Sequence, residues 1–397
     1  MNIQFQNIHY LPRFGGGPVT YITHAAQELS QRGHEVSIVC RRAEPGLAAS
    51  ERFPWATVLR HDDPPVHGAA WMIEPLLYAR HMRRVVPQLV NGTQMVIARN
   101  CLYAFATAME LPALPLVYVT PSLAVRDVAD PALAGTVKEA WIRRFQRRQY
   151  AYLEGHAVRR ARWIVTFSEI RRRETIDTYG VSADRVLVIP PGVPQEHVAG
   201  AAVDVAPLRR KLELPQDAQV VLTACRLVDR KNLPLLLRAM AGIKRHTVYL
   251  VIVGRGPDQP VLELLAKNLK IADRVRFAGV QTQMQPFYAM ADLFVLPSSY
   301  EPFGFVLLEA MANGVPCIGL RAEYPRRVVS NDEIIEDGVT GFCVNDSTTA
   351  LQDAMERVLS DRQLRQQMGQ AARERCQARY SWKRHIDSLL DLVKGGA

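Results

Sequence analysis

A strand–helix–strand pattern that opens the chain and restarts in its middle constrains the fold more than any other feature. In the first copy, residues 3–8 are a strand candidate, a glycine turn occupies 15–17, and a second strand-forming run follows at 35–40. Between the turn and that second run, apolar positions recur at helical spacing from Val19 to Leu29. Two strands joined through a helix pair in parallel, because only a crossover connection brings the chain back to the same edge of a sheet. The pattern therefore predicts a doubly wound α/β fold.

Two domains of this kind fit the 397 residues, since each would be large enough to bury a full core. Further strands are predicted in the first half at 95–97, 116–119 and 163–167. The run Pro190-Pro191-Gly192-Val193-Pro194 breaks the pattern, which resumes with strands at 220–224, 248–253, 275–278, 293–296 and 316–319. We predict one domain over 1–195, a second over 196–378 with a cleft between them, and a helical segment over 379–397.

Composition narrows the class of protein. Hydrophobic residues make up 48% of the chain, which excludes a disordered protein. No apolar run reaches the roughly 18 residues of a membrane-spanning helix, and the start of the chain lacks the basic and apolar regions of a secretory signal. The six cysteines stand far apart, as expected of buried thiols in a reducing compartment rather than of metal ligands. A cytoplasmic protein is therefore predicted.

The charge balance predicts an anionic partner, because the net charge is +10 and the pI is near 9.4. Between Lys138 and Arg162 there are eight Lys or Arg residues against two acids, with Trp141, Phe145, Tyr150 and Tyr152 among them. This segment predicts a basic amphipathic helix. Either its basic face is simply solvated, or it docks on an anionic membrane surface, where aromatic residues among cations are typical. We expect no nucleic-acid partner, because no recognisable nucleic-acid module accompanies the segment.

The strongest chemical signal lies between Glu301 and Glu309. A buried strand is predicted at 293–296, and a helix is predicted to begin after Gly304. Glu301 then precedes that helix, whereas Glu309 lies inside it among apolar neighbours. A carboxylate in such a position is costly unless it is paired. Hydroxyl groups of a sugar or a ribose would pair it.

Four weaker signals leave alternatives open. The turn at 15–17, including Gly16 and Gly17, is either a phosphate-contacting loop at a helix start or a plain turn. The segment 254–256 is interpreted as a tight turn. Arg226 and Lys231 follow a strand whose carboxyl end faces a ligand crevice, so they are either a diphosphate site or solvated charges. Arg99 and Asn100 follow a strand of the first domain, and bind an anionic acceptor or form a structural pair.

Taken together, these motifs resemble the retaining, nucleotide-sugar-dependent glycosyltransferases of the GT-B fold, in particular their family-4 branch. The resemblance covers nearly the whole chain and is most specific in Glu301-x7-Glu309. The weaker matches, in chain order, are 15–17 with 33–36, 190–193, Arg226-x4-Lys231, 333–341 and Ser381-Trp382. In this fold the final helix crosses back to the first domain, so the resemblance implies the same for 379–397.

The resemblance also implies roles for individual residues. Arg226 and Lys231 would neutralise the diphosphate of the departing nucleotide, with backbone groups of Gly16 and Gly17 helping from the first domain. Glu301 would bind the donor sugar and Glu309 the ribose hydroxyls. The N–H groups of Phe303, Gly304 and Phe305 would line the same pocket. No metal is implied, because the two cations replace it and no Asp-x-Asp is present. The donor would be a nucleoside diphosphate sugar, with UDP as the expected nucleotide, and the acceptor a glycan or lipid-linked hydroxyl.

The sequence departs from the family pattern at two places. Where the family often has a His facing the donor sugar, this chain has Thr120-Pro121-Ser122, so no such His is carried over. Before Glu333, where the family usually has a glycine pair, Asn331-Asp332 stands instead. Two other functions remain open on sequence grounds: a nucleotide-sugar epimerase of the same fold, and a non-catalytic nucleotide-sugar binding protein.

Overall fold

The computed structural model of the chain describes residues 1–11, 17–42, 44, 46–66, 68–120, 122–127, 137–193 and 203–394. The chain forms two compact units. Unit 1 contains Met1–Pro191 together with Trp382–Ala397, and unit 2 is the intervening stretch Gly192–Ser381. The predicted boundaries at 195 and 378 lie a few residues from these points.

Unit 1 is built on an eight-stranded sheet with the order β3-β4-β2-β1-β5-β6-β7-β8. The pairs among its strands are parallel, except that β3 runs antiparallel to β4. Its strands are β1 Asn2–Gln6, β2 Glu35–Arg41, β3 Ser50–Phe53, β4 Ala56–His61, β5 Met95–Ala98, β6 Leu116–Val119, β7 Trp163–Thr166 and β8 Val186–Val188. The chain order reverses between β1 and β5, so the crevice of this sheet lies at the carboxyl ends of those two strands.

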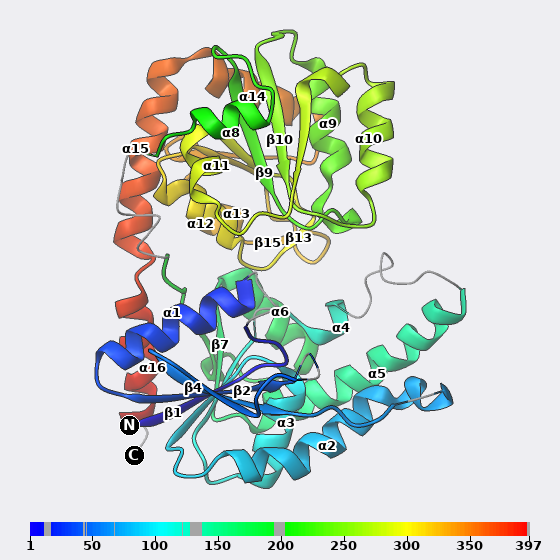
Figure 1. Ribbon diagram of the computed structural model, residues 1–397, viewed down its shortest axis with the longest axis vertical. Helices are drawn as coiled ribbons and strands as arrows, with labels where there is room; N and C mark the ends of the chain where they lie inside the picture. Colours follow the sequence, from blue (N-terminus) through cyan, green and yellow to red (C-terminus); the bar gives the residue numbers. More distant parts are fainter. Residues whose placement is uncertain are drawn as a thin grey trace. The chain divides into compact units, whose positions relative to one another are not determined.

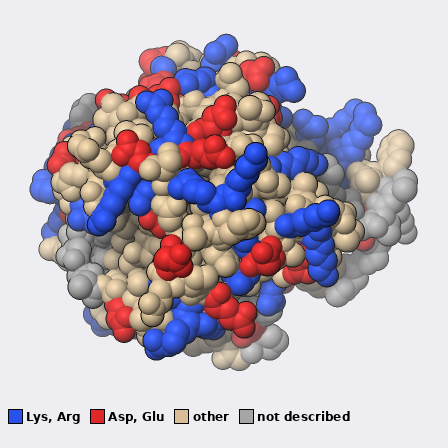
Figure 2. Space-filling view, turned by 90° about the horizontal axis from the view of Figure 1, so that it is seen from above, with Lys and Arg blue, Asp and Glu red and all other residues tan. Residues whose placement is uncertain are grey.

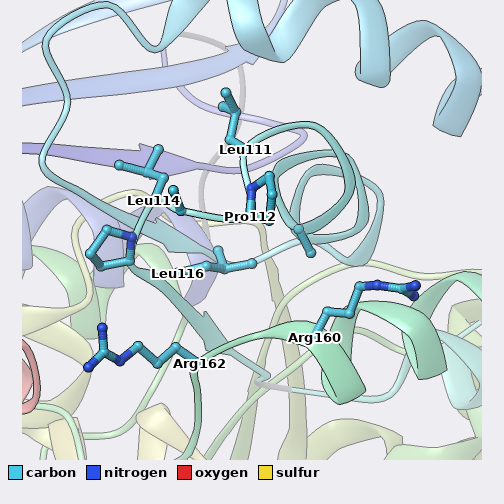
Figure 3. A pocket seen from close by; sticks show the side chains of 9 residues that line it. Leu111, Pro112, Leu114, Leu116, Arg160 and Arg162 are labelled. Atoms are coloured by element: carbon cyan, nitrogen blue, oxygen red, sulfur yellow. The ribbon is translucent and has the colours of Figure 1, made fainter. Parts of the chain in front are cut away.

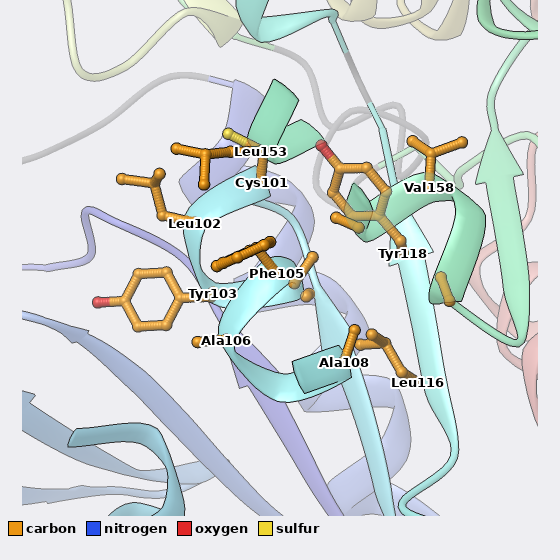
Figure 4. Close-up of a cluster of buried hydrophobic side chains, with 14 of the residues drawn as sticks. Cys101, Leu102, Tyr103, Phe105, Ala106, Ala108, Leu116, Tyr118, Leu153 and Val158 are labelled. Atoms are coloured by element: carbon orange, nitrogen blue, oxygen red, sulfur yellow. The ribbon is translucent and has the colours of Figure 1, made fainter. Parts of the chain in front are cut away.

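Helices cover both faces of this sheet (Figure 1). They are α1 Gly17–Gln31, η1 Gly68–Ile73, α2 Glu74–Leu89, α3 Cys101–Glu110, α4 Ala124–Asp127, α5 Val137–Arg160, α6 Glu169–Tyr179, η3 Ala183–Arg185 and α16 Trp382–Lys394. Helix α3 is buried along most of its length, and Phe105 and Ala108 pack in one cluster with Tyr118 of β6 and Leu153 of α5 (Figure 4). This packing anchors the long basic helix α5 to the sheet.

Unit 2 repeats the architecture on a six-stranded parallel sheet with the order β11-β10-β9-β12-β14-β16. A short parallel pair, β13 with β15, stands apart from it. The strands are β9 Gln219–Ala224, β10 Val248–Val253, β11 Val275–Gly279, β12 Leu293–Leu296, β13 Tyr300–Glu301, β14 Cys317–Leu320, β15 Val328–Val329 and β16 Gly341–Val344. The helices are α8 Ala206–Lys211, η4 Asp229–Lys231, α9 Leu233–Gly242, α10 Gln259–Asn268, η5 Ala272–Arg274, α11 Gln285–Met290, α12 Phe305–Ala312, α13 Asn331–Ile334, α14 Thr348–Ser360 and α15 Arg362–Arg379.

The final helix, α16, belongs to unit 1, where it packs along α1 (Figure 1). His385 of α16 is fully buried and forms a hydrogen bond of 2.8 Å through Nε2 with the Tyr21 hydroxyl of α1. Its Nδ1 lies 3.0 Å from the carbonyl oxygen of Pro190. Trp382 stacks on His24 of α1, with ring centroids 5.7 Å apart. Hydrogen bonds and aromatic contacts therefore hold α16 against α1 and complete unit 1.

The buried His385 predicts a pH-dependent stability. Burial lowers the pKa of its imidazole from 6.5 to about 4. Between these values the unfolded chain binds a proton that the folded chain does not, so the free energy of unfolding falls as pH drops through this window, by up to about 3 kcal/mol. Urea unfolding of the wild type and of His385→Gln, compared between pH 7 and pH 4, should show a shallower slope for the variant. Some slope should remain, because burial also lowers the pKa of His9 to about 4. Equal slopes would contradict the assignment.

Candidate active site

The residues predicted to bind a diphosphate and a sugar meet at the carboxyl edge of the unit 2 sheet. Strand β9 pairs with β10 on one side and with β12 on the other, and the chain order reverses there. Arg226 and Lys231 lie in the loop and short helix after β9, and Glu301 lies just after β12. Ligands of doubly wound sheets bind at such a reversal point. The topology therefore brings together residues that are 70 positions apart in the sequence.

Backbone hydrogen bonds fix these two loops relative to each other. The N–H of Ser299 donates to the carbonyl of Arg230 at 2.9 Å, which ties the loop after β12 to η4. Glu301 lies in β13 and pairs with Val329 of β15, and its carbonyl accepts from the N–H of Ser330 at 3.1 Å. The backbone of Glu301 is therefore held from two sides.

Lys231 and Glu301 form a direct ion pair, in which the ammonium group donates to Oε2 of the carboxylate. Their side chains are 14% and 17% exposed, so the pair lies at the boundary between protein and solvent. Sequence reasoning assigned the two residues to different parts of a ligand and did not foresee this contact. The pair places the two assigned binding groups next to each other.

Arg226 is exposed, and in the described chain it forms no ion pair or side-chain hydrogen bond. Its loop packs tightly against the loop after β10, where the N–H of Leu227 donates to the carbonyl of Arg255 at 3.1 Å. A Cβ atom on Gly254 would lie 1.9 Å from the carbonyl oxygen of Cys225, and one on Gly256 would lie 2.1 Å from that of Leu227. The glycines of the predicted tight turn therefore permit the close approach that positions Arg226.

Gly304 starts helix α12 in a backbone conformation that only glycine adopts easily. Its φ is +47°, and an added Cβ would meet Leu307 at 3.0 Å. The rings of Phe303 and Phe305 flank it with centroids 5.2 Å apart, and Phe303 also contacts Tyr380. The three predicted backbone groups thus lie at the start of α12, directly after Glu301.

Glu309 is half-buried on α12, and a tyrosine that sequence reasoning missed is bound to it. The hydroxyl of Tyr288, which is fully buried in α11, donates to Oε2 of Glu309 at 2.6 Å. Burial and the neighbouring carboxylate raise the pKa of Tyr288 well above its usual value, so the hydroxyl remains a donor. The available signal was a tyrosine within an apolar stretch, because a buried tyrosine hydroxyl needs a polar partner.

In unit 1, Arg99 and Asn100 follow β5, at the reversal point of that sheet. Arg99 is 5% exposed, and its guanidinium carbon lies 4.0 Å from the centre of the Tyr21 ring. Nη1 donates to the carbonyl of Pro18 at 3.3 Å, while Nε and Nη2 have no partner in the described chain. Burial lowers the pKa of Arg99 to about 10. Asn100 instead caps α3, because its side-chain oxygen accepts from the N–H of Leu102 at 3.0 Å.

The remaining predicted positions are placed as follows. Gly17 begins α1, whereas Gly16 lies outside the described residues. Thr120, near the position of the missing His, is fully buried and accepts from Nη2 of Arg171 at 2.7 Å. Asn331 donates to the carbonyl of Leu320 at 2.8 Å and packs where Gly319 has no side chain. Both departures from the family pattern are therefore built into local polar contacts.

One surface hollow of unit 1, of about 240 Å³, lies away from these residues. It is lined by 111–116 at the start of β6 and by Arg160 and Arg162 (Figure 3). The start of a parallel strand is the edge opposite to the one that carries a ligand crevice. We assign no catalytic role to this hollow.

Comparison with known proteins identifies the class. The family model described as "Glycosyl transferases group 1" matches 204–375, and "Glycosyltransferase Family 4" matches 15–197. The chain is 30% identical to D-inositol 3-phosphate glycosyltransferase of Acidothermus cellulolyticus, over 96% of this chain and 85% of that protein. The lipopolysaccharide core biosynthesis glycosyltransferase LpsE of Rhizobium meliloti is 35% identical over 48% of this chain and 54% of its own length. The chain spans about half the length of LpsE. It also spans about half the length of LpsD, another lipopolysaccharide core biosynthesis glycosyltransferase of Rhizobium meliloti.

The structure is also similar to that of Anabaena HepE in complex with UDP-glucose, with a TM-score of 0.75 and 20% identity over 100% of both chains. The architecture is that of the GT-B glycosyltransferases, with two Rossmann-like domains. The chain belongs to the glycosyltransferase family 4, with the group 1 domain in unit 2. Among the helices that the structure describes, none combines the length and apolar character needed to cross a membrane.

Proposed function

We propose that this protein transfers a sugar, with retention and without a metal ion, from a nucleoside diphosphate sugar to a hydroxyl of a glycan or glycolipid. The observation that carries the proposal is the contact between Lys231 and Glu301 at the reversal point of unit 2, with Arg226 in the same loop after β9. Two cations suit a diphosphate, and a carboxylate beside them suits sugar hydroxyls. UDP is the expected nucleotide, as in the HepE complex.

In the proposed reaction, the bond between the anomeric carbon and the diphosphate oxygen breaks, and a bond to the acceptor oxygen forms on the same face. The acceptor proton passes to the departing phosphate. Positive charge builds on the sugar ring and negative charge on the leaving phosphate. Arg226 and Lys231 stabilise that negative charge, the largest electrostatic change of the step. Glu301 keeps acceptor sites for sugar hydroxyls while paired with Lys231, because a carboxylate accepts about four hydrogen bonds.

A nucleotide-release experiment tests this function against both alternatives. The protein is first screened by thermal shift over nucleotide sugars, since a ligand at 100 times its dissociation constant stabilises by about 2.7 kcal/mol. With the best donor, release of nucleoside diphosphate that requires an added acceptor supports transfer. Conversion of the donor into an isomeric nucleotide sugar without acceptor indicates an epimerase. Tight binding with no turnover on any acceptor indicates a binding protein.

Metal independence is a separate prediction. Activity should persist in excess chelator, because the guanidinium of Arg226 and the ammonium of Lys231 supply the positive charge that a divalent ion would otherwise provide. The measurement is the turnover rate with and without chelator after the protein has been dialysed. A loss of turnover that magnesium or manganese restores would contradict the prediction.

Tyr288 is expected to orient Glu309 toward the ribose. Tyr288→Phe removes the hydroxyl that binds Oε2, so Glu309 is held less well, and we expect a loss of about 1 kcal/mol, or roughly fivefold, in affinity for UDP. The loss should be confined to the ribose. Calorimetry should therefore show that wild type prefers UDP over its 2′,3′-dideoxy analogue, and that the variant prefers it less. An unchanged preference would mean that Tyr288 only supports the fold.

A further inference from the structure

An exposed apolar segment lies on unit 1, outside the candidate site. Trp71, Met72 and Ile73 of η1 are 36%, 43% and 41% exposed, and Leu76 at the start of α2 is 40% exposed. These four residues lie within six positions of the chain, at the junction of η1 and α2. Contiguous apolar patches on a soluble surface mark interaction sites. Sequence reasoning did not single out this segment.

The outer face of α5 carries a second group of exposed aromatic side chains. Trp141 is 72% exposed, Phe145 44% and Tyr152 57%. With Arg148, they recur at spacings of three and four, which places all four on one face of the helix. Glu154, one of the two acids of the basic segment, is turned inward, where it is fully buried and accepts from Tyr118 and Tyr179. The outer face is therefore more basic than the sequence count indicates.

Two side chains join η1 to α5. Gln146 and Gln149 of α5 are 5% and 7% exposed, and their amide groups donate to the carbonyls of Trp71 and Met72, each at 2.8 Å. These buried bonds fix the two segments side by side. We call the result the η1–α5 surface, defined by the exposed side chains of 71–73 and of Trp141, Phe145 and Tyr152, with Arg144, Arg147 and Arg148.

Among the residues that the structure describes, no acidic side chain pairs with the three arginines of this surface. Arg144, Arg147 and Arg148 are exposed, and within the described ranges none of them forms an ion pair. Lys and Arg side chains gather at the right-hand edge of Figure 2, on the side to which α5 extends in Figure 1. Elsewhere on the face shown in Figure 2, basic and acidic side chains are interspersed. The η1–α5 surface thus combines exposed apolar side chains with exposed arginines, and Glu74 lies at its junction, where it accepts from Gln146 at 3.4 Å.

We propose that the η1–α5 surface docks on an anionic lipid bilayer. Trp and Tyr are the side chains that settle at the level of lipid headgroups, and unpaired arginines bind lipid phosphates. A protein partner would be expected to cover the apolar side chains, whereas the exposed arginines beside the aromatic rings of α5 favour an anionic lipid surface. The proposal goes beyond sugar transfer and does not depend on it. It would hold the protein on a membrane, where a lipid-linked acceptor is found.

Co-sedimentation with vesicles tests the docking. The protein should bind vesicles of phosphatidylcholine mixed with phosphatidylglycerol, and bind phosphatidylcholine alone much more weakly. Arg144→Gln, Arg147→Gln and Arg148→Gln together should weaken binding about 100-fold at low salt, since each cation near an anionic surface contributes about fivefold. The binding should also weaken as salt rises, because the charges become screened. Trp141→Ser with Trp71→Ser should weaken binding while leaving the salt dependence in place.

Matched controls lie on unit 2. Val261 and Leu264 of α10 are 65% and 58% exposed, and Lys267 is exposed on the same helix. Serine at the first two positions and glutamine at Lys267 should leave vesicle binding unchanged. Bromine-labelled lipid should quench the fluorescence of the wild type more than that of Trp141→Phe. The proposal is overturned if anionic vesicles do not bind at low salt, if the α10 variants lose as much binding, or if an oligonucleotide binds through the same arginines while vesicles do not.

Discussion

Alanine at either Arg226 or Lys231 is expected to lower the turnover of sugar transfer by two or more orders of magnitude. The charge that builds on the departing diphosphate would lose one of its two cations at the moment it is needed, and the loss of one such group typically costs about 100-fold or more. The two variants should differ in their secondary effects. Arg226 has no side-chain partner in the described part of the chain, so its removal should leave the rest of the site unchanged. Removal of Lys231 also frees the carboxylate of Glu301.

The measurement is the steady-state rate of nucleotide release with a saturating donor and acceptor. Arg238→Ala, which removes an exposed cation from α9 of the same unit, is the matched control and should retain the wild-type rate. Thermal unfolding should confirm that all three variants are folded. Wild-type rates in the Arg226 or Lys231 variant would refute the assignment of the diphosphate site.

Substitutions of the two glutamates should affect catalysis and UDP binding separately. Glu301→Gln should lower kcat by about 100-fold while the affinity for bare UDP changes little, because its expected partner is the sugar. Glu309→Gln should weaken UDP binding by about tenfold, because its expected partner is the ribose and hydrogen bonds to charged groups contribute about 1.5–3 kcal/mol.

Calorimetry with UDP and rate measurements with the full donor distinguish the two glutamates. Glu309→Gln should still accept a hydrogen bond from Tyr288 through its amide oxygen, so the fold of α11 and α12 should persist. Should both variants bind UDP like the wild type, Glu309 would lose its assigned role. Should Glu301→Gln turn over at the wild-type rate, the sugar would have to be held elsewhere.

The doubly wound fold was predictable because several of its inner strands are continuous apolar runs. β6, β10 and β12 were predicted at the residues where they occur, and the other predicted strands differ by a few residues at their ends. The strands that were missed are short or lie near a sheet edge. β8 has only three residues, of which two are half-buried, and β3 is largely exposed. Such strands form because a neighbouring strand offers backbone hydrogen bonds. This stabilisation depends on the folded sheet and cannot be predicted from the local sequence.

The candidate site was predictable in its parts but not in its contacts. Arg226, Lys231 and Glu301 could be placed at strand ends from the pattern alone. Their order across the sheet decides that Lys231 meets Glu301, and strand order is not encoded in any one segment. The contact of Tyr288 with Glu309 was equally unpredictable, because the two residues lie on separate helices. Gln146 and Gln149 look like exposed polar residues of α5 in the sequence, but both are buried and donate hydrogen bonds to η1.

Because α16 belongs to unit 1, unit 1 can be completed only after unit 2 has been synthesised. Unit 2 is one uninterrupted length of chain, and its two ends are tied where the N–H of Val193 donates to the carbonyl of Tyr380 at 3.2 Å. Unit 1 is split, because its last helix emerges from the ribosome only after all of unit 2. The nascent chain must therefore keep the α1 surface around Tyr21 uncovered until the final residues arrive. A premature stop before Trp382 would spare every candidate residue of unit 2 and still leave unit 1 unfinished.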